Sequence, residues 1–434
     1  MSLRICAAAA AILAAAALPA HAQDTTGQRG VRIGLTYTPG SKPGVVVLPV
    51  DGPGGDSVRA IVGRDLDFGD RIEVIDGSGV SQPASGNGAV SYGIWKSLGA
   101  AALVQVTLIT PSLVRVAVHD VTAKKVAQSR DFPIAADVGS AAWRMDVHGI
   151  SDEVERWITG VRGIARTRIL YVKGGRVYVV DSDGYGERAV TSSGTALAPA
   201  WHPDGHHIAY SQLGTSGWNV EVLDLAGGSA RPVTATSGGL NTTPAFSPDG
   251  QWLVYAHGAE NGTDLYAVPA FTGGAARRIT LGRGTDNVSP TFSPDGRRIA
   301  FTSGRSGHPE VYTADFDGSN MELLTPFNFG DQNYRSNPDW SPDGRSIVFQ
   351  SQLAGLFQIM TINLRDRSIK QLTSEGANED PSWAPDGRHV VFTSTRTGVK
   401  QLFVLDTESG RSRQLTHSSG SRLSAWSRYL DRAP

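Results

Sequence analysis

A short motif recurs at intervals of 43 to 48 residues through the second part of the chain, and no other feature constrains the fold as strongly. Each copy places an aromatic residue ahead of a Pro-Asp-Gly turn, as in the stretch FSPDG at residues 292–296. A period in the forties that contains strand patterns is typical of propeller blades and not of helical solenoids. The aromatic residues are Trp201, Phe246, Phe292, Trp340 and Trp383, with a degenerate sixth at Trp426.

Each copy of the repeat predicts four strands. The first strand ends at the aromatic residue, after which proline presets φ, aspartate bonds nearby backbone and glycine closes the turn. An alternating strand such as 299–303 follows, then a strand such as 310–315, and a tight turn leads to a fourth strand of the type seen at 277–280. Because the turn itself favours aspartate, we interpret the repeated aspartates as structural and not as a ring of metal ligands. They are Asp204, Asp249, Asp295, Asp343 and Asp386.

The strands left over at the two ends of the repeat region predict how the ring closes. Five complete units run from about residue 196 to 416 and leave one inner strand near 423–427 without outer partners. Upstream, 169–173, 177–181 and 187–191 predict three strands without an inner strand. The two remainders complete each other, which closes the ring and leaves no free sheet edge. We therefore predict an all-β six-bladed β-propeller over residues 165–434, with its last blade built from both ends of that region and the aromatic residues wedged between blades.

Residues 23–162 lack the repeat and predict a separate N-terminal α/β domain. Strand-like and helix-like patterns alternate there, as in α/β sandwiches. The last helix carries one apolar face, and Ser151 with Asp152 suggests a restart within it. A short glycine-containing linker at 160–163 indicates that the two domains pack as a rigid pair. The expected strands are 31–37, 45–50, 71–75, 103–109, 113–119 and 126–132, and the expected helices are 57–67, 89–98 and 140–159.

The first 22 residues have the pattern of a secretory signal peptide. One arginine precedes an apolar run from Ile5 to Leu18, and the small-x-small triplet at 20–22 supplies a cleavage site. The single cysteine, Cys6, lies in this leader, so the mature chain has no thiol for disulfides, thiolate catalysis or cysteine-ligated metals. We expect an exported protein of a bacterial periplasm, with no membrane span after cleavage and a monomeric state.

Composition and missing motifs argue against several functional classes. The chain has 40 Lys+Arg against 41 Asp+Glu, so its charge does not favour nucleic acid as a partner. It contains neither a Gly-x-Ser-x-Gly elbow nor a phosphate-binding glycine loop. His206 and His207 adjoin on a predicted strand and face opposite ways, so they cannot chelate one ion together, and His148 is interpreted as a packed helix residue. We expect no catalytic residues, no metal site and no cofactor.

The mouth of the propeller channel is the remaining candidate for function. The segment joining each fourth strand to the next aromatic residue must cross from the rim of one blade to the axis of the next, so its last residues are expected to surround the opening. Their polar, charged and aromatic types suit a protein or peptide partner, with a merely solvated set of loops, or a small ligand or metal in the channel, as alternatives. The candidate residues are Leu240, Asn241, Thr242, Thr243, Asp286, Asn287, Val288, Tyr334, Arg335, Asn378, Glu379 and Arg422.

Several segments resemble the TolB family, the periplasmic components of Tol-Pal systems. The stretch HGISDEVERWITGVRGIARTRILYV at 148–172 bridges the two predicted domains, and DSDGYGE at 181–187 and WSRYL at 426–430 flank the repeats. In the N-terminal part, GVVVLPVDG at 44–52 is similar to the first domain of that family. The resemblance covers essentially the whole mature chain.

The resemblance implies a non-enzymatic interaction scaffold. In that family the channel face docks the peptidoglycan-associated lipoprotein Pal, and the matching positions here are Leu240 to Thr243 and Asn287 to Ser289. The start of the mature chain, 23–32 here, corresponds to the segment that reaches the inner-membrane protein TolA. The system supports outer-membrane integrity and envelope constriction in cell division. The alternative is a secreted propeller enzyme of lactonase or lyase type, which needs metal ligands or paired carboxylates directed into the channel.

Overall fold

The structure is a computed structural model that describes residues 41–80, 90–192, 194–215, 217–234, 239–282, 284–325 and 334–431. The leader expected at 1–22, the segment 23–32 and the strand expected at 31–37 lie outside the described residues. The residues that the structure describes fall within one compact unit. None of their helices is both long enough and apolar enough to cross a membrane.

Residues 41–159 contain a five-stranded sheet with helices, which we call the α/β region. The strand order is β2-β1-β3-β4-β5, with β1 parallel to both of its neighbours and the remaining pairs antiparallel. Each strand and helix expected from residue 45 onward occurs here, with shifted ends. The elements are β1 Gly44–Val47, α1 Gly55–Phe68, β2 Glu73–Val74, α2 Tyr92–Ser97, β3 Ala100–Thr110, β4 Leu113–Asp120, β5 Lys125–Pro133 and α3 Ala141–Thr159.

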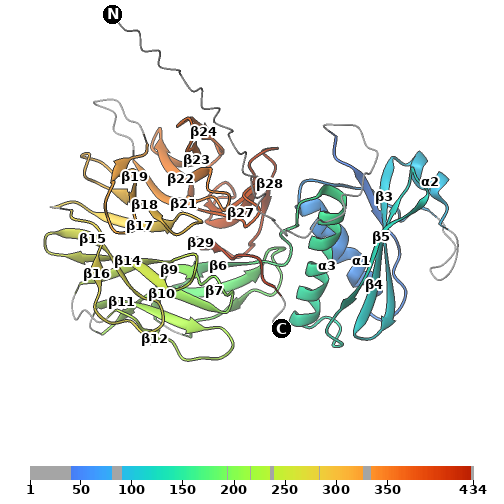
Figure 1. The fold of residues 1–434 in the computed structure, drawn as a ribbon, viewed down its shortest axis with the longest axis horizontal. Coiled ribbons are helices and arrows are strands. Elements are labelled where there is room, and N and C mark those ends of the chain that lie inside the picture. The colour runs from blue at the N-terminus through green and yellow to red at the C-terminus, as the bar shows by residue number, and fades with distance from the viewer. Residues whose placement is uncertain are drawn as a thin grey trace, which may run out of the picture. The chain divides into compact units, whose positions relative to one another are not determined.

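The side chains of β1 alternate between two apolar layers, as expected for a strand buried on both faces. Val45 and Val47 enter the large core that α1 and α3 complete. Val46 points the other way, into a smaller cluster around Trp95 of α2. Figure 1 shows α1 and α3 lying together on one side of the sheet.

Helix α3 is continuous, so the restart expected at Ser151 is wrong. The helix begins at the cap Ser140, and Ser151 turns its hydroxyl inward to a buried carboxylate of α1. Asp152 does not cap a helix either. Its carboxylate accepts the backbone N–H groups of Ala165 at 2.7 Å and Arg166 at 3.1 Å, and so fixes the chain that leads from α3 into the propeller.

The remaining described residues form a β-propeller built from one eight-stranded and four four-stranded sheets. The eight-stranded sheet joins β9 Thr195–Trp201, β10 His207–Gly214, β11 Gly217–Asp224, β12 Arg231–Pro232, β13 Leu240–Phe246, β14 Trp252–Ala259, β15 Gly262–Pro269 and β16 Arg277–Arg278. The first four-stranded sheet contains β17 Asn287–Phe292, β18 Arg298–Ser303, β19 Glu310–Asp315 and β20 Glu322–Leu323. The second contains β21 Arg335–Trp340, β22 Ser346–Leu353, β23 Leu356–Asn363 and β24 Ile369–Gln371. The third contains β25 Asn378–Trp383, β26 His389–Ser394, β27 Gln401–Asp406 and β28 Ser412–Gln414.

The fourth four-stranded sheet combines the two ends of the propeller region, and this predicted pairing is confirmed. Its strands are β29 Arg422–Trp426, β6 Arg168–Lys173, β7 Arg176–Asp181 and β8 Arg188–Ala189. Trp426 pairs with Ile169, and Arg422 pairs with Val172. The indole N–H of Trp426 also donates to Thr167 Oγ1 at 2.8 Å. The last strand therefore fills the inner position that the first three strands leave open.

Neighbouring propeller sheets share apolar cores, which explains the aromatic residue of each repeat. In one cluster, Ala300 and Val311 from the β17–β20 sheet contact Ile347 and Phe349 from the next sheet, with Trp340 among them. Trp340 is only 8 % exposed, so its ring is buried in the seam between the two sheets. Equivalent clusters contain Phe246, Phe292, Trp383 and Trp426.

The aspartates of the repeat bind local backbone. Asp249 Oδ1 accepts from the hydroxyl of Ser247 and from the backbone N–H of Gln251, and Asp295 and Asp343 make the same two bonds. These carboxylates hold the turn between the first and second strands of each sheet. Asp204 and Asp386 differ, because a histidine side chain also binds each of them.

Candidate interaction site around the propeller channel

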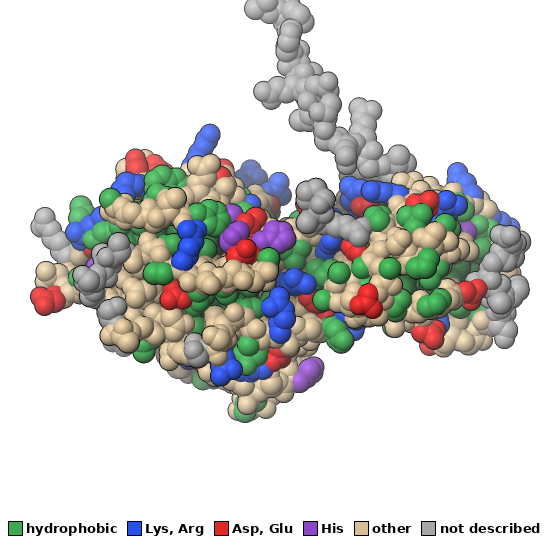
Figure 2. All heavy atoms as spheres, turned by 90° about the horizontal axis from the view of Figure 1, so that it is seen from below, with side chains coloured by type: hydrophobic (Ala, Val, Ile, Leu, Met, Phe, Trp, Pro, Cys, Tyr) green, Lys and Arg blue, Asp and Glu red, His purple; other side chains and the backbone are tan. Residues whose placement is uncertain are grey.

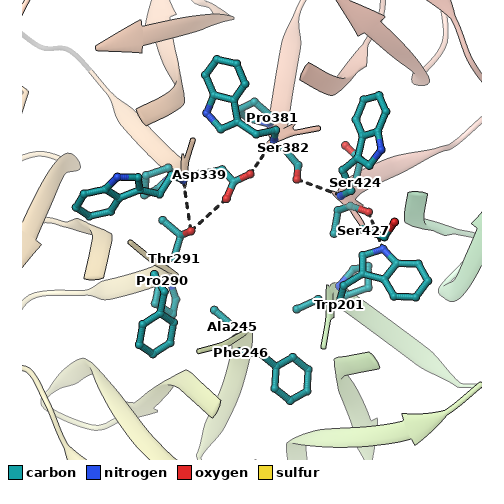
Figure 3. Close-up of a pocket in the computed structure, with 18 of the residues that line it drawn as sticks. Trp201, Ala245, Phe246, Pro290, Thr291, Asp339, Pro381, Ser382, Ser424 and Ser427 are labelled. Atoms are coloured by element: carbon teal, nitrogen blue, oxygen red, sulfur yellow. Dashed lines mark hydrogen bonds between the residues drawn. The ribbon is translucent and has the colours of Figure 1, made fainter. Parts of the chain in front are cut away.

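The strand that ends at the aromatic residue of each repeat faces a central cavity of about 600 Å³. These strands are β9, β13, β17, β21, β25 and β29. Figure 3 looks into this cavity and shows residues of the inner strands arranged around it. The cavity is the channel that the sequence predicts.

Each inner strand bulges three residues before the aromatic residue of its repeat. The bulged residue has a positive φ of 46° to 55° and coincides with a shift in strand register. A left-handed conformation is unfavourable for residues other than glycine, and such strain commonly marks functional positions. In five of the six strands proline stands at the next position, where it fits because the bulge interrupts the ladder of hydrogen bonds. The bulged residues are Ala198, Thr243, Ser289, Asn337, Asp380 and Leu423.

The bulged residues form a hydrogen-bonded chain around part of the channel. Ser289 N donates to Thr243 Oγ1 at 3.1 Å, and Ser289 Oγ donates to Asn337 Oδ1 at 3.0 Å. Asn337 Nδ2 donates to Asp380 Oδ1 at 2.8 Å, and the other oxygen of Asp380 accepts Leu423 N at 3.1 Å. Five inner strands are therefore tied to one another at one level of the channel.

A second level lies two residues further along each strand and is polar on one side only. Thr291 Oγ1 donates to Asp339 Oδ1 at 3.1 Å, and Trp383 N donates to Asp339 Oδ2 at 2.8 Å. Ser382 Oγ accepts Trp426 N at 3.1 Å. Figure 3 shows Thr291, Asp339 and Ser382 along one arc of the channel. The opposite arc is apolar at this level and consists of Ala200, Ala245 and Ala425.

Replacing Asp339 with asparagine is expected to raise the free energy of unfolding at pH 7.5 by about 1–2 kcal/mol. Burial raises the pKa of Asp339 to about 6, and hydrogen bonds from Trp383 and Thr291 offset only part of that effect. A folded-state pKa above the ordinary 3.8 means that stability falls as pH rises through this window, because the folded chain disfavours the carboxylate. Asparagine removes that cost.

Urea unfolding of the Asp339→Asn variant and the parent chain tests this expectation. The gain in stability should be clear at pH 7.5 and small at pH 4.5, where the parent carboxyl is protonated. A variant that is less stable than the parent at both pH values would show that the carboxylate is a favourable part of the channel wall.

Three residues expected at the channel mouth are buried, and for them the expectation is wrong. Asn241, Asn287 and Asn378 are 0 % exposed. Their side-chain amides donate to backbone carbonyls of neighbouring strands or loops, as Asn241 Nδ2 does to Trp218 O at 3.0 Å. An amide that satisfies buried backbone cannot also meet a partner from outside. These asparagines hold blades together.

The other expected residues differ in how accessible they are. Leu240 and Tyr334 are 44 % and 42 % exposed, and Asp286 and Arg422 are exposed as well. Arg335 is held by Glu310, with Nη1 at 3.2 Å from Oε2. The half-buried remainder comprises Thr242, Thr243, Val288, Arg335 and Glu379.

Four further apolar residues lie on the same face as Leu240 and Tyr334, and the sequence analysis missed them. Because adjacent strands run in opposite directions, turns between second and third strands reach the same end of the propeller as the starts of the inner strands. Segments that leave the fourth strands also end there. The four residues are Leu213 at 44 %, Leu281 at 75 %, Leu356 at 50 % and Val399 at 46 % exposed. We call these six exposed residues the apolar rim: Leu213, Leu240, Leu281, Tyr334, Leu356 and Val399.

The charges on the described surface are of mixed sign. Figure 2 shows blue and red side chains interspersed over one face of the molecule, without a large area of a single sign. This agrees with the near balance of 40 basic and 41 acidic residues.

A family model described as the TolB beta propeller domain matches residues 155–430, which is more than half of the chain. The chain belongs to the TolB β-propeller family. The match begins inside α3 and extends past β29, so the segment that enters the propeller and the strand that closes it are both family features.

Relatives agree with this family assignment. The chain is 32 % identical over 204 residues to the Tol-Pal system protein TolB of Chromobacterium violaceum, and 31 % identical over 193 residues to that of Methylobacillus flagellatus. These matches cover 44 % and 43 % of this chain, and the chain spans about half the length of the curated relatives it matches, 47 % and 43 %. The crystal structure of TolB from Acinetobacter baumannii has the same fold, with a TM-score of 0.77 over 89 % of this chain and 97 % of that one at 24 % identity.

Proposed function

We propose that this protein is a periplasmic, non-enzymatic interaction scaffold of a Tol-Pal system, and that its channel mouth docks a Pal-like outer-membrane lipoprotein. Membership of the TolB propeller family and the names of the relatives support a role in that system. The observation that carries the docking site is the apolar rim, because exposed apolar side chains around a polar opening are typical of protein interfaces. The role extends to outer-membrane integrity and to envelope constriction in cell division.

The finer architecture belongs to the same proposal. The eight-stranded sheet counts as two blades, since β9–β12 and β13–β16 each repeat the four-strand order and meet through one pair, Trp218 with Leu240. The ring then has six blades over residues 165–434, after a signal peptide at 1–22 and an α/β domain at 23–162. The start of the mature chain, 23–32, contacts a TolA-like inner-membrane protein, and the mature protein is a monomer.

An enzyme site in the channel, of lactonase or lyase type, is the weaker candidate. Asp339 and Asp380 face the channel, and such chemistry would need free carboxylates there. Both oxygens of each side chain instead accept hydrogen bonds from neighbouring strands. Carboxylates that hold blades together favour a scaffold over a catalytic pair.

Replacing Leu281 and Leu356 with serine together is expected to weaken binding of a purified Pal-like domain from the same source by about tenfold or more. The two side chains are 75 % and 50 % exposed, so their loss removes contact area without opening the core. Ile109→Ser is the matched control, because Ile109 is 46 % exposed and lies on β3 of the α/β region. Calorimetric titration of the mature chain measures the affinities.

The control variant should bind like the parent chain. Absence of parent binding at concentrations on the order of tens of micromolar would refute the docking role. Equal affinities of the parent and the double-serine variant would instead place the contact elsewhere on the propeller.

A further inference from the structure

The turn between β9 and β10 differs from its counterparts in the other repeats. It reads WHPDGHH at 201–207, so three histidines surround one aspartate. At the position of His202, the other turns carry a small side chain, namely Ser247, Ser293, Ser341 and Ala384. A repeat that departs from its own pattern by adding imidazoles calls for an explanation other than turn formation.

The turn fixes the Asp204 carboxylate so that one oxygen faces two imidazoles. Oδ1 accepts the backbone N–H groups of His206 at 2.8 Å and His207 at 3.0 Å. Oδ2 is thereby directed to His207 Nδ1 at 2.7 Å and His202 Nδ1 at 2.9 Å. Three potential ligand atoms from three residues thus lie within 4.8 Å of one another.

The hydrogen bonds of His202 indicate which of its nitrogens carries a proton. His202 Nε2 lies 3.1 Å from Gly250 O, and a carbonyl can only accept, so Nε2 is the donor. Nδ1 receives the backbone N–H of Asp204 at 3.2 Å, which requires a lone pair there. In this neutral form the Nδ1 lone pair and the Asp204 carboxylate face each other at 2.9 Å. Two acceptors at that distance repel unless a cation lies between them.

An equivalent turn elsewhere in the propeller shows a cation at the corresponding place. Asp386 Oδ1 accepts the backbone N–H groups of Arg388 and His389, and its Oδ2 lies 2.8 Å from His389 Nδ1, just as Asp204 binds His206 and His207 in the turn between β9 and β10. Arg71 Nη2 lies 3.0 Å from the same Oδ2 of Asp386.

The other two clusters of histidine and carboxylates among the described residues already contain a positive group. Asp183, beside His148, is paired with Arg144 at 2.7 Å. Asp406, near His389, is paired with Arg388 at 2.6 Å. No arginine or lysine within 4 Å of Asp204 is recorded in the part of the chain that the structure describes. Among these three clusters, the one in the turn between β9 and β10 is therefore best suited to an external cation.

We infer that this turn binds a divalent transition-metal ion, and that the ion is Zn²⁺. Its ligands are His202 Nδ1, Asp204 Oδ2 and His207 Nδ1. Mixed nitrogen and carboxylate ligands suit Zn²⁺ and its neighbours, whereas Ca²⁺ and Mg²⁺ prefer oxygen ligands alone. Bonds of about 2.1 Å in a tetrahedral site place ligand atoms about 3.4 Å apart. The distances from Asp204 Oδ2 to the two Nδ1 atoms, 2.9 and 2.7 Å, are within about 0.7 Å of that spacing. The side chains of Asp204 and His207 are 33 % and 30 % exposed, which leaves the fourth position open to water.

The surroundings of His202 resemble the supporting shell of a metal-bound imidazole. A backbone carbonyl accepts from its other ring nitrogen, which is the arrangement that orients metal-ligating histidines in general. The rings of Phe246 and Phe271 lie 4.9 Å from the imidazole and hold it in place. A Cβ at Gly250, where φ is 73°, would come within 2.3 Å of His202 Nε2, so glycine is required for this contact.

Titration of the purified mature chain with Zn²⁺ alone at pH 7.5 tests the inference. The parent should take up one tightly bound ion, and His202→Ser and His207→Ser should each weaken its affinity by at least about tenfold. Both variants restore residues that other turns of this propeller carry, Ser341 and Ser346 among them, so they are expected to fold. His206→Ser is the matched control, because His206 is an exposed neighbour that points away from the cluster.

Proton-detected ¹⁵N spectra of the imidazoles supply a second readout. Zn²⁺ should shift the His202 and His207 Nδ1 signals and leave that of His206 unchanged. A parent chain that binds no Zn²⁺, or a His202→Ser variant that binds as tightly as the parent, would overturn the inference. A His202 imidazolium without bound metal would assign the cationic role to a proton instead.

Discussion

Replacing Trp426 with alanine is expected to lower the free energy of unfolding by about 3–5 kcal/mol. The indole is only 6 % exposed and packs with Ile169 and Tyr171, which belong to the opposite end of the propeller region. Alanine leaves a cavity in this core and removes the indole partner of the buried Thr167 hydroxyl. The loss also loosens β29 from β6, the strand pair that closes the ring.

Urea unfolding followed by fluorescence and by far-ultraviolet circular dichroism measures this change. Arg422→Ala is the control, because Arg422 lies on the same strand but is exposed, and it should change stability by less than about 0.5 kcal/mol. Trp426→Phe should lose much less than Trp426→Ala, since it keeps most of the buried ring. A Trp426→Ala variant within about 1 kcal/mol of the parent would show that closure does not depend on this residue.

Periodicity in the sequence was sufficient to predict the strands of the propeller. The alternation in Leu113–His119 likewise predicted β4, which the structure extends by one residue to Asp120. Both signals work because burial on one or both faces of a strand constrains every second side chain. The pairing of β29 with β6 followed from counting, since a strand without partners is unfavourable at a sheet edge.

The prediction of residues at the channel mouth failed for three asparagines, which recur at one position of the repeat and were interpreted as binding residues. Asn241, Asn287 and Asn378 each stand five residues before an aromatic residue of the repeat. A residue type that recurs at one position of a repeat indicates a role in the repeat itself, and this signal was present in the sequence. Leu213, Leu281 and Leu356 of the apolar rim gave no such signal, because each stands alone in its turn and only the fold brings them to one face.

The contacts between the α/β region and the propeller also could not be predicted from the sequence. Arg71 and Asp386 are 315 residues apart, yet Nη2 lies 3.0 Å from Oδ2. The Pro-Asp-Gly pattern accounts for the turn at Asp386 and contains no information about a distant arginine. Partners of this kind depend on how two folded parts meet, which no local pattern encodes.

His389 lies at the centre of these contacts and is fully buried. Its Nδ1 is 2.8 Å from Asp386 Oδ2, and its Nε2 is 3.4 Å from Asp70 Oδ2 in the α/β region. The nearby charged groups on the packed elements are Asp386, Asp70 and Asp406 on the negative side and Arg71, Arg388 and Arg411 on the positive side. Burial alone would lower the pKa of His389, but its bonds to Asp386 and Asp70 and the charge of Asp386 outweigh burial and raise it.

Replacing His389 with glutamine is therefore expected to cost about 3–5 kcal/mol at pH 5.5 and less as the pH rises. A raised histidine pKa gives stability that is fully present below the ordinary 6.5 and is lost as pH increases through the folded-state pKa. Asp386 acts in the opposite sense, because its lowered pKa gives stability above 3.8 that is lost in acid. The difference between parent and variant should be largest between about pH 4.5 and 6.5. Unfolding curves at half-unit intervals from pH 4 to 9 measure this difference in unfolding free energy. His206→Gln is the control, because His206 is exposed. A difference that stays constant across this range would show that His389 is neutral in the folded protein.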